Sequence, residues 1–293
     1  MCSISGWIAQ KPLSPDIARR LSTALLHYGM ERGDQSAGVF ANNRTLKRAM
    51  RPDAFVETKE FRTFFHTPTK MALLHTRMPT CGGIGHEQAQ PFRAGNTVSV
   101  HNGFYFDVKG IRDFWNLKKP SGIDSELVAQ FVNSKGVSKL PDFLNTTDGP
   151  SAVAVWHDDN LWLARTGNPT YVLKLHWGAD QHIVIFASTA DILMSAAKHV
   201  WLLHPEHKPF PTREGQVYQV TPKRLIKKFK TFSQFYPFFY PKSKGYWWED
   251  ELDDDKPQTE ISQLWDGLEE NSRNTLGYTP TWEPSYRKRQ PKP

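Results

Sequence analysis

The first eight residues, MCSISGWI (residues 1–8), contain the stretch on which the fold assignment rests. The chain has 293 residues and two cysteines, and one of them, Cys2, directly follows the initiator methionine. If Met1 is removed, the thiol and the freed α-amine belong to the same residue, which places a nucleophile beside its own base. Because chain termini tolerate many residues, this position alone does not establish a role. The residues after Cys2 read as a short strand.

Composition sets broad limits on the class of protein. Apolar residues make up 39% of the chain, which is enough for a hydrophobic core, and the net charge is +7. No stretch approaches the roughly 20 apolar residues of a membrane span, and the N-terminus lacks a signal-peptide pattern. Cys2 and Cys81 are too far apart to suggest a disulfide framework or a cysteine zinc site. We therefore expect a cytoplasmic protein with no cofactor and no metal; a metal site at 204–207 (HPEH) is a weak alternative.

The charge distribution predicts two parts of the chain. Residues 2–225 carry regular apolar patterns and are predicted to form the globular domain. Residues 226–293 contain an aromatic segment (232–248), an acidic run (249–255) and a basic end. Such a composition is typical of an extension that is partly disordered or that binds a partner.

Local signals predict a mixture of helices and strands. Ser14 and Pro15 open a helix with apolar spacing of three to four that ends near Gly29. The triplet 124–126 opens a second helix that ends near Gly136, and a third helix is expected around 192–197. Strands are predicted at 71–76, 97–100, 152–156, 161–164, 171–175, 183–186 and 216–220. Groups of antiparallel-looking strands between helices indicate an α+β domain with layered sheets.

Several polar clusters follow these apolar runs, at places where a scaffold holds a site. Each is weak by itself, because Arg-Gly-Asp is usually a surface turn and His-Asn-Gly is a common hairpin turn. The clusters are ERGDQSAG (31–38), HTRMPT (75–80), QAQPF (88–92), HNG (101–103) and DSE (124–126).

In this order, and after a terminal cysteine, the clusters resemble the motifs of the class II glutamine amidotransferases. Cys2-Ser3-Ile4-Ser5-Gly6 matches the family's opening, and the segments 148–152, 164–169 and 187–189 are similar to its second half. The resemblance covers about the first three quarters of the chain, from Cys2 to about Val220. It implies an N-terminal-nucleophile (Ntn) hydrolase fold, a four-layer αββα sandwich of two antiparallel sheets.

The resemblance implies a catalytic group of three residues. Cys2 would be the nucleophile, and its α-amine, which titrates near the thiol, would act as the base. The side-chain amide of Asn102 and the backbone N–H of Gly103 would stabilise the oxyanion of the tetrahedral intermediate. A glutamyl thioester on Cys2 would then be hydrolysed by water.

The resemblance also implies a substrate clamp. Arg77 would hold the α-carboxylate of L-glutamine with its planar fork, and Asp124 would pair with the α-ammonium, with Thr80 nearby. Arg32 and Asp34 are expected to support the region around the nucleophile. The simpler alternatives are an ordinary ion pair for Arg77 and a helix N-cap for Asp124.

The sequence departs from the family pattern at three places. Ser3 replaces a glycine and adds a Cβ where the backbone usually approaches closely. Met78-Pro79 replaces Trp-Ala, and Gln88 replaces Asn. None of these changes removes a group that the mechanism needs. We expect His75 and His101 to be packed rather than catalytic, and Cys81 to be a small neutral filler.

The ammonia would need an acceptor. About 70 residues follow the predicted domain, too few and too polar for a second catalytic domain, so we expect a separate synthetase or transferase as the partner. Two alternatives stay open: a related hydrolase of γ-glutamyl or other small amides, and a non-catalytic scaffold whose basic tail binds protein or nucleic acid. For the lysines and arginine of 223–230, a solvated strand face is preferred over nucleic-acid binding.

Overall fold

The computed structural model describes residues 2–78, 83, 85–118, 123–147, 149–177, 181–200, 204–205 and 208–230. The chain divides into two compact units, 1–238 and 239–293, and all described residues belong to the first. Thr80, Cys81, Pro79, the Glu206-His207 half of the weak metal motif, and the aromatic and acidic segments of the extension lie outside the described residues.

The first sheet contains the N-terminal strand and is antiparallel at each pairing. Its order is β11-β9-β10-β1-β4-β2-β3, and β12 also pairs with β9. The strands are β1 (Ser3–Leu13), β2 (Ser36–Ala41), β3 (Arg44–Arg48), β4 (Thr69–Arg77), β9 (Tyr171–Trp177), β10 (Gln181–Ala187), β11 (His204–Pro205) and β12 (Phe210–Pro211).

The second sheet is also antiparallel at each pairing, in the order β14-β13-β8-β7-β6-β5. Its strands are β5 (Phe92–Ala94), β6 (Thr97–Gly103), β7 (Ser151–His157), β8 (Asn160–Thr166), β13 (Gln216–Val220) and β14 (Leu225–Lys230). Strand β14 begins at the predicted domain boundary, and its exposed Lys227 and Lys228 lie on an edge strand. The boundary at 225 stays a prediction.

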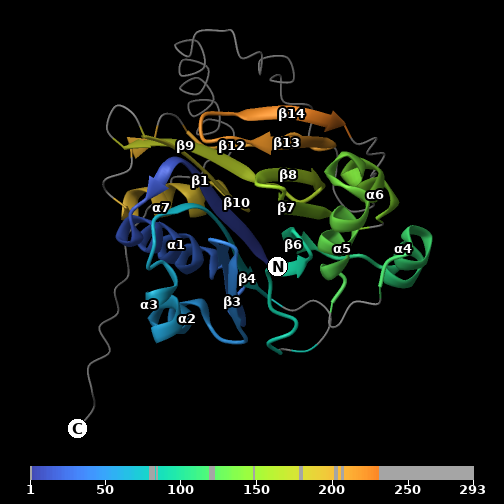
Figure 1. Cartoon of the computed structure of the whole chain (residues 1–293), viewed down its shortest axis with the longest axis horizontal. Coiled ribbons are helices and arrows are strands. Elements are labelled where there is room, and N and C mark those ends of the chain that lie inside the picture. Colours follow the sequence, from blue (N-terminus) through green and yellow to red (C-terminus); the bar gives the residue numbers. More distant parts are fainter. Residues whose placement is uncertain are drawn as a thin grey trace, which may run out of the picture. The chain divides into compact units, whose positions relative to one another are not determined.

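The helices form the outer layers of the sandwich (Figure 1). One apolar core joins α1, α2, α3 and α7 to the first sheet, a second lies between the sheets, and a third joins α4, α5 and α6 to the second sheet. This arrangement confirms the α+β, αββα expectation. The helices are α1 (Pro15–Gly29), α2 (Pro52–Glu57), α3 (Lys59–Phe64), α4 (Val108–Trp115), α5 (Glu126–Lys135), η1 (Val137–Lys139), α6 (Leu140–Thr146) and α7 (Ala190–His199).

Strand β1 runs through the middle of the first sheet because both of its faces are apolar. Trp7 belongs to the core beneath the helices, whereas Ile4 and Ile8 belong to the core between the sheets, as the two-residue period of a strand requires. A Cβ at Gly6 would lie 2.4 Å from the Ala72 carbonyl oxygen and 2.6 Å from the ring of Phe186. Only glycine therefore fits at this position, and β1 holds Cys2 at the end of a rigid central strand.

Most predicted elements are confirmed, and the first helix has the predicted cap. The Oγ of Ser14 accepts a hydrogen bond from the Ile17 amide, Pro15 follows it, and the helix ends at Gly29. The sequence reading missed the hairpin of β2 and β3, although Asn42-Asn43 forms its turn with positive φ at both residues. Short or strongly polar elements such as β3 have little apolar periodicity to reveal them.

Candidate active site

Cys2 directly precedes Ser3, the first residue of β1, and lies beside Arg77, the last residue of β4. Ser3 pairs with Thr76, so the next position in the register sets Cys2 opposite Arg77. The Cys2 thiol donates to the Met78 carbonyl oxygen at 3.5 Å. Burial raises the pKa of the Cys2 thiol, and the charges of Arg77 and Asp124 shift it in opposite directions, Arg77 lowering it and Asp124 raising it. The thiol is therefore within electrostatic reach of both predicted clamp residues.

The turn that precedes β2 packs against the other side of the β4 end. The Nε of Arg32 donates to the Cys2 carbonyl oxygen at 3.1 Å. A Cβ at Gly33 would lie 2.4 Å from both the Arg77 carbonyl carbon and the Met78 nitrogen. Glycine at 33 thus lets the turn approach β4 closely enough for Arg32 to reach Cys2. The contact is of the kind expected for a supporting residue.

Asp34 supports the same turn from the outside. Its carboxylate pairs with Arg51 at 2.9 Å, and Arg51 also pairs with Asp53 at 3.1 Å. These side chains are well exposed, so the pairs contribute little stability individually. Their geometric effect is to connect the turn at 31–35 to the start of α2.

Arg77 is the last residue of β4 and is buried, with 3% of its surface exposed. Its Nη1 donates to the Gly83 carbonyl oxygen at 2.8 Å. The backbone also links it to the preceding turn, because the Gln35 amide donates to the Arg77 carbonyl oxygen at 3.0 Å. A buried guanidinium beside a thiol is suited to binding a carboxylate. Thr80, its predicted neighbour in the clamp, lies outside the described residues.

Asp124 is buried just before α5 and does not act as the N-cap. Ser125 occupies the N-cap position of α5, and that cap makes no side-chain hydrogen bond. One oxygen of Asp124 accepts from the Tyr105 amide at 2.7 Å, and the other accepts from the Ser125 amide at 2.9 Å. These two bonds hold the carboxylate in place, and its negative charge acts to raise the pKa of the Cys2 thiol.

Asn102 and Gly103 end β6 and do not form a hairpin turn. Asn102 is 2% exposed, and among the described residues its side-chain Nδ2 has no hydrogen-bond partner. A buried polar donor without a partner is costly and calls for an explanation. A Cβ at Gly103 would lie 2.2 Å from the Pro150 carbonyl oxygen, so this position also requires glycine.

A buried network joins the two sheets next to these residues. The side chain of Gln90 bonds both backbone groups of His101, at 2.7 Å to the amide and 3.0 Å to the carbonyl oxygen. The Nε2 of His75, on β4, lies 3.3 Å from the same carbonyl oxygen, and the Nδ1 of His101 lies 2.9 Å from the Ser125 hydroxyl. The network therefore connects the strand that carries Arg77 with the strand that carries Asn102.

Neither histidine is suited to proton transfer at neutral pH. Burial lowers the pKa of His75 to about 3 and that of His101 to about 4. Both imidazoles are therefore neutral under ordinary conditions. This agrees with the prediction that they are packed rather than catalytic, and leaves the α-amine of the trimmed chain as the expected base.

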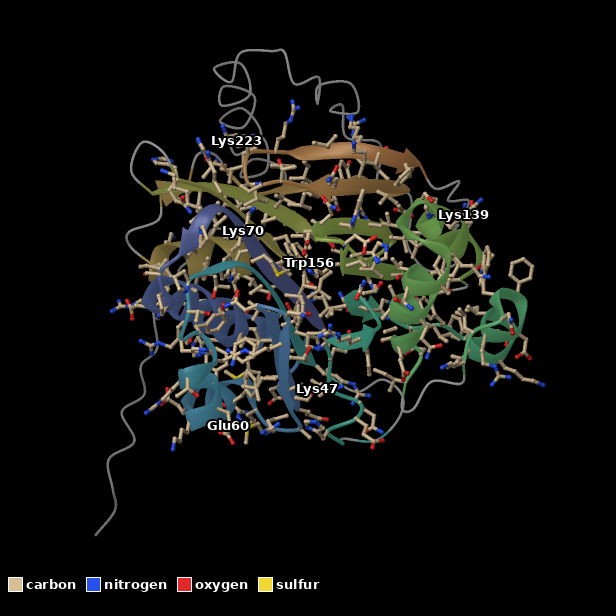
Figure 2. All side chains as sticks on the ribbon, viewed as in Figure 1. Lys47, Glu60, Lys70, Lys139, Trp156 and Lys223 are labelled. Carbon is tan, nitrogen blue, oxygen red and sulfur yellow. The ribbon has the colours of Figure 1, made fainter. Side chains whose placement is uncertain are left out.

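Lys47 holds the segment that carries Gln90, a role that the sequence did not reveal. Its Nζ donates to the Ala89 carbonyl oxygen at 2.7 Å and lies 4.7 Å from the centre of the Phe92 ring. Figure 2 labels Lys47 near the β3 side of the first sheet. Burial lowers the pKa of Lys47. The long side chain thus ties the first sheet to the segment before β5.

Asn168 is a second residue whose role sequence reasoning missed. Its Nδ2 donates to the Asn102 carbonyl oxygen at 2.8 Å and to the Pro150 carbonyl oxygen at 3.2 Å. It lies in the loop between β8 and β9, where the chain crosses from the second sheet to the first. The sequence analysis placed Asn168 in a segment, 164–169, that is similar to the second half of the family, but it gave this residue no role.

The Ser3 side chain, which stands where the family has glycine, is buried beside α1 and Thr76. A Cβ at Gly29 would lie 3.4 Å from the Ser3 hydroxyl and 3.4 Å from two side-chain atoms of Thr76. These distances are ordinary van der Waals contacts, so Gly29 lies close to Ser3 without being required by it. The substitution changes the packing beneath Cys2 without removing a group of the predicted mechanism.

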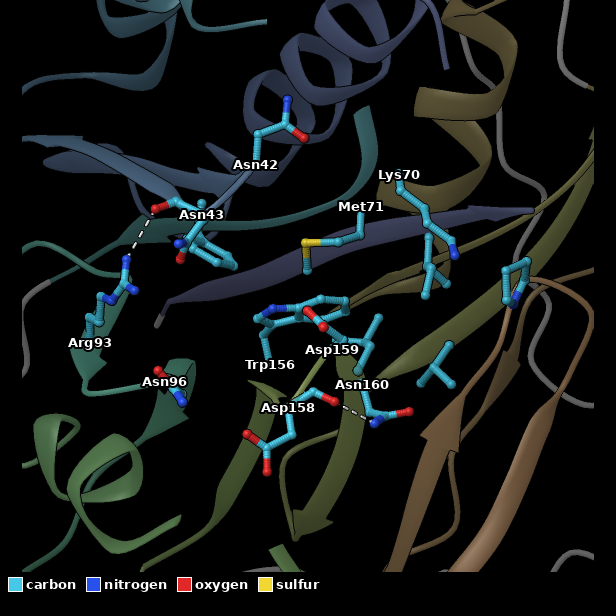
Figure 3. Close-up of a pocket in the computed structure, with 15 residues that line it drawn as sticks. Asn42, Asn43, Lys70, Met71, Arg93, Asn96, Trp156, Asp158, Asp159 and Asn160 are labelled. Carbon is cyan, nitrogen blue, oxygen red and sulfur yellow. Dashed lines mark hydrogen bonds between the residues drawn. The ribbon is translucent and has the colours of Figure 1, made fainter. Parts of the chain in front are cut away.

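A cavity of about 850 Å³ lies at the opposite end of the space between the sheets (Figure 3). Lys70 and Met71 line it at the start of β4, whereas Arg77 is at the end of that strand. Trp156 lines it from the far end of β7, and Arg93 donates to the Asn43 carbonyl oxygen at 3.0 Å at its rim. The cavity is thus separate from the residues around Cys2.

The described residues hold no group of three or more His, Cys, Asp or Glu side chains placed to bind a metal ion. Their helices include none that is both long and apolar enough to cross a membrane.

Comparison with known proteins agrees with the ordered motifs. The chain is 27% identical over 240 residues to glutamine–fructose-6-phosphate aminotransferase (isomerizing) of Caulobacter vibrioides, covering 74% of this chain and 38% of that protein. Its fold matches the glutamine phosphoribosylpyrophosphate amidotransferase of B. subtilis bound to ADP and GMP with a TM-score of 0.60 and 17% identity. A structure of the allosteric regulatory enzyme of purine biosynthesis matches with the same values. No family model matches the chain.

The sequence match and the shared fold support a class II glutamine amidotransferase domain in this chain. The two structural matches cover 79% of this chain and show the shared Ntn-hydrolase fold. They cover 50% of the matched chains, and the curated relative is matched over 38% of its length. This amidotransferase domain therefore corresponds to only part of each of these proteins.

Proposed function

We propose that the protein hydrolyses L-glutamine to glutamate and ammonia through a Cys2 glutamyl thioester. The observation that carries the proposal is the buried Asn102 amide, whose Nδ2 has no partner among the described residues. An oxyanion that forms beside Cys2 would supply the missing acceptor, together with a bond from the Gly103 amide.

The chemical steps follow from the groups around Cys2. With Met1 removed, the α-amine takes the thiol proton as the sulfur attacks the side-chain amide carbon of glutamine. The tetrahedral intermediate collapses by breaking the carbon–nitrogen bond, and the same amine returns the proton to the departing ammonia. Water then attacks the thioester, which releases glutamate and restores the thiol.

The clamp selects a free amino acid as the substrate. Arg77 would bind the α-carboxylate and Asp124 the α-ammonium, because both charges already act on the thiol. A γ-glutamyl peptide or another small amide is the alternative substrate class. The ammonia would pass to a separate acceptor synthetase or transferase. A non-catalytic scaffold with a basic partner-binding tail is the remaining alternative.

Intact mass and activity test the proposal directly. Incubation with the glutamine-mimicking diazoketone 6-diazo-5-oxo-L-norleucine should add one adduct to a chain that lacks Met1, and Cys2→Ala should abolish it. Purified protein should also release glutamate from L-glutamine. Retention of Met1, or a trimmed chain that neither forms the adduct nor releases glutamate, contradicts the proposal. Faster release of ammonia from γ-glutamyl amides than from glutamine would favour the alternative substrate.

A further inference from the structure

We propose that Asn168 is a positioning residue for the oxyanion site, and this inference rests on the function proposed above. Its side-chain amide fixes the peptide group between Asn102 and Gly103. The carbonyl oxygen that accepts from Asn168 at 2.8 Å and the Gly103 N–H belong to that same peptide group. Because a peptide group is planar and trans, fixing its carbonyl direction also fixes the direction of its N–H.

The direction of the Gly103 N–H follows from the strand pattern. The amide and carbonyl of His101 both bond the Gln90 side chain, on the side of β6 away from β7. Successive residues of a strand direct their backbone groups to alternate sides. The Asn102 carbonyl therefore points toward β7, where Asn168 reaches it, and the Gly103 N–H points to the opposite side.

Asn168 also donates a hydrogen bond to a second carbonyl oxygen at the end of β6, that of Pro150. The Pro150 carbonyl oxygen lies so close to Gly103 that no Cβ would fit, and Asn168 donates to it as well, at 3.2 Å. The side-chain amide of Asn168 thus donates to the carbonyl oxygens of both Asn102 and Pro150. A donor on the carbonyl also polarises the peptide, which makes its N–H a stronger hydrogen-bond donor.

The test compares Asn168 with Asn160, a half-buried asparagine at the other end of β8. Asn160 donates to the Asp158 carbonyl oxygen at 2.7 Å and accepts from Gln219 at 2.7 Å, remote from the Cys2 end. Asn168→Ala removes the two donors. Asn168→Asp keeps the side-chain shape but sets a carboxylate oxygen against the two carbonyls. Asn160→Ala and Asn160→Asp make the same chemical changes away from the site.

We expect both Asn168 variants to lower kcat for glutaminase by roughly 10- to 100-fold, with KM changed less than about twofold. The inhibition constant of glutamate γ-semialdehyde, whose aldehyde forms a tetrahedral adduct with the thiol, should rise by a similar factor. The Asn160 variants should keep wild-type values. Wild-type kinetics in the Asn168 variants, a loss confined to KM, or an equal loss in the Asn160 variants would overturn the inference.

An NMR measurement separates this inference from the proposed function. The amide resonance of Gly103 should move upfield in proton shift in Asn168→Ala and stay in place in Asn160→Ala, whether or not the protein hydrolyses glutamine. An unmoved Gly103 resonance overturns the positioning role. A moved resonance in a protein that lacks glutaminase activity supports the positioning role and overturns only the proposed reaction.

Discussion

The Nε of Arg32 donates a hydrogen bond of 3.1 Å to the carbonyl oxygen of Cys2, between residues 30 positions apart in the sequence. This bond fixes the backbone of the proposed nucleophile from outside the strand that carries it. Burial lowers the pKa of Arg32, while the nearby Cys2 opposes that effect.

Replacing Arg32 should therefore slow the chemistry more than it weakens the fold. We expect Arg32→Ala to lower kcat for glutaminase and the rate of diazoketone labelling by roughly 10-fold or more, because small displacements of a nucleophile are costly. The control is Arg20→Ala, which removes an exposed partner of Asp16 at 2.7 Å. Labelling of Arg32→Ala at the wild-type rate would show that the bond does not position Cys2.

Two glycines beside Arg77 should differ in how well they tolerate substitution by alanine. In Gly33→Ala the new Cβ would lie 2.4 Å from the backbone of Arg77 and Met78, so the turn must move away from β4. In Gly83→Ala, the new Cβ would meet nothing within 4 Å. We expect at least a 10-fold fall in kcat for the first variant and less than a twofold change for the second, measured by glutamate release. Equal activities would mean that the close approach of the turn is unnecessary.

Asn102→Ala should separate catalysis from stability. Loss of one oxyanion donor is expected to lower kcat by roughly 10²–10³-fold with little change in KM. Because the wild-type amide is buried and has no partner among the described residues, its removal should cost less than about 1 kcal/mol of unfolding free energy. Urea denaturation and steady-state kinetics on the same preparation check both parts. A large loss of stability with intact kcat would assign Asn102 a structural role instead.

The two buried histidines should make the fold sensitive to acid. Burial lowers the pKa of His75 to about 3 and that of His101 to about 4, from 6.5. Between these values and 6.5 the unfolded chain binds protons that the folded chain does not, so stability is full above pH 6.5 and falls as the pH decreases. The expected loss at pH 5 is about 2 kcal/mol per histidine.

Urea denaturation at pH 7 and pH 5 measures this loss. The variant His75→Gln keeps a donor near the His101 carbonyl oxygen but cannot titrate, so its stability should fall less steeply with pH than that of the wild type. Identical pH slopes for the two proteins would show that His75 does not supply this acid sensitivity.

The sequence by itself determined the identity of the site motifs and the class of the fold. Apolar patterns predicted the long strands, because a strand buried on one face alternates with a period of two and a strand buried on both faces is a continuous apolar run. The capped helix at Ser14 and Pro15 was also readable, since its signals are local. The ordered motifs from Cys2 to Asp124 predicted which side chains belong together.

Tertiary structure alone decided how those side chains are held. Three contacts join segments that are far apart in the chain. They are the hydrogen bond from Arg32 to Cys2, the close approach of Gly33 to Arg77, and the hydrogen bond from Asn168 to Asn102. Such contacts leave no periodic signal, because each depends on the path of an irregular turn or loop: the turn between α1 and β2 for Arg32 and Gly33, and the loop between β8 and β9 for Asn168. The Asp124 carboxylate shows the same limit: its position before α5 resembles a helix cap, yet the fold turns it toward the Tyr105 amide.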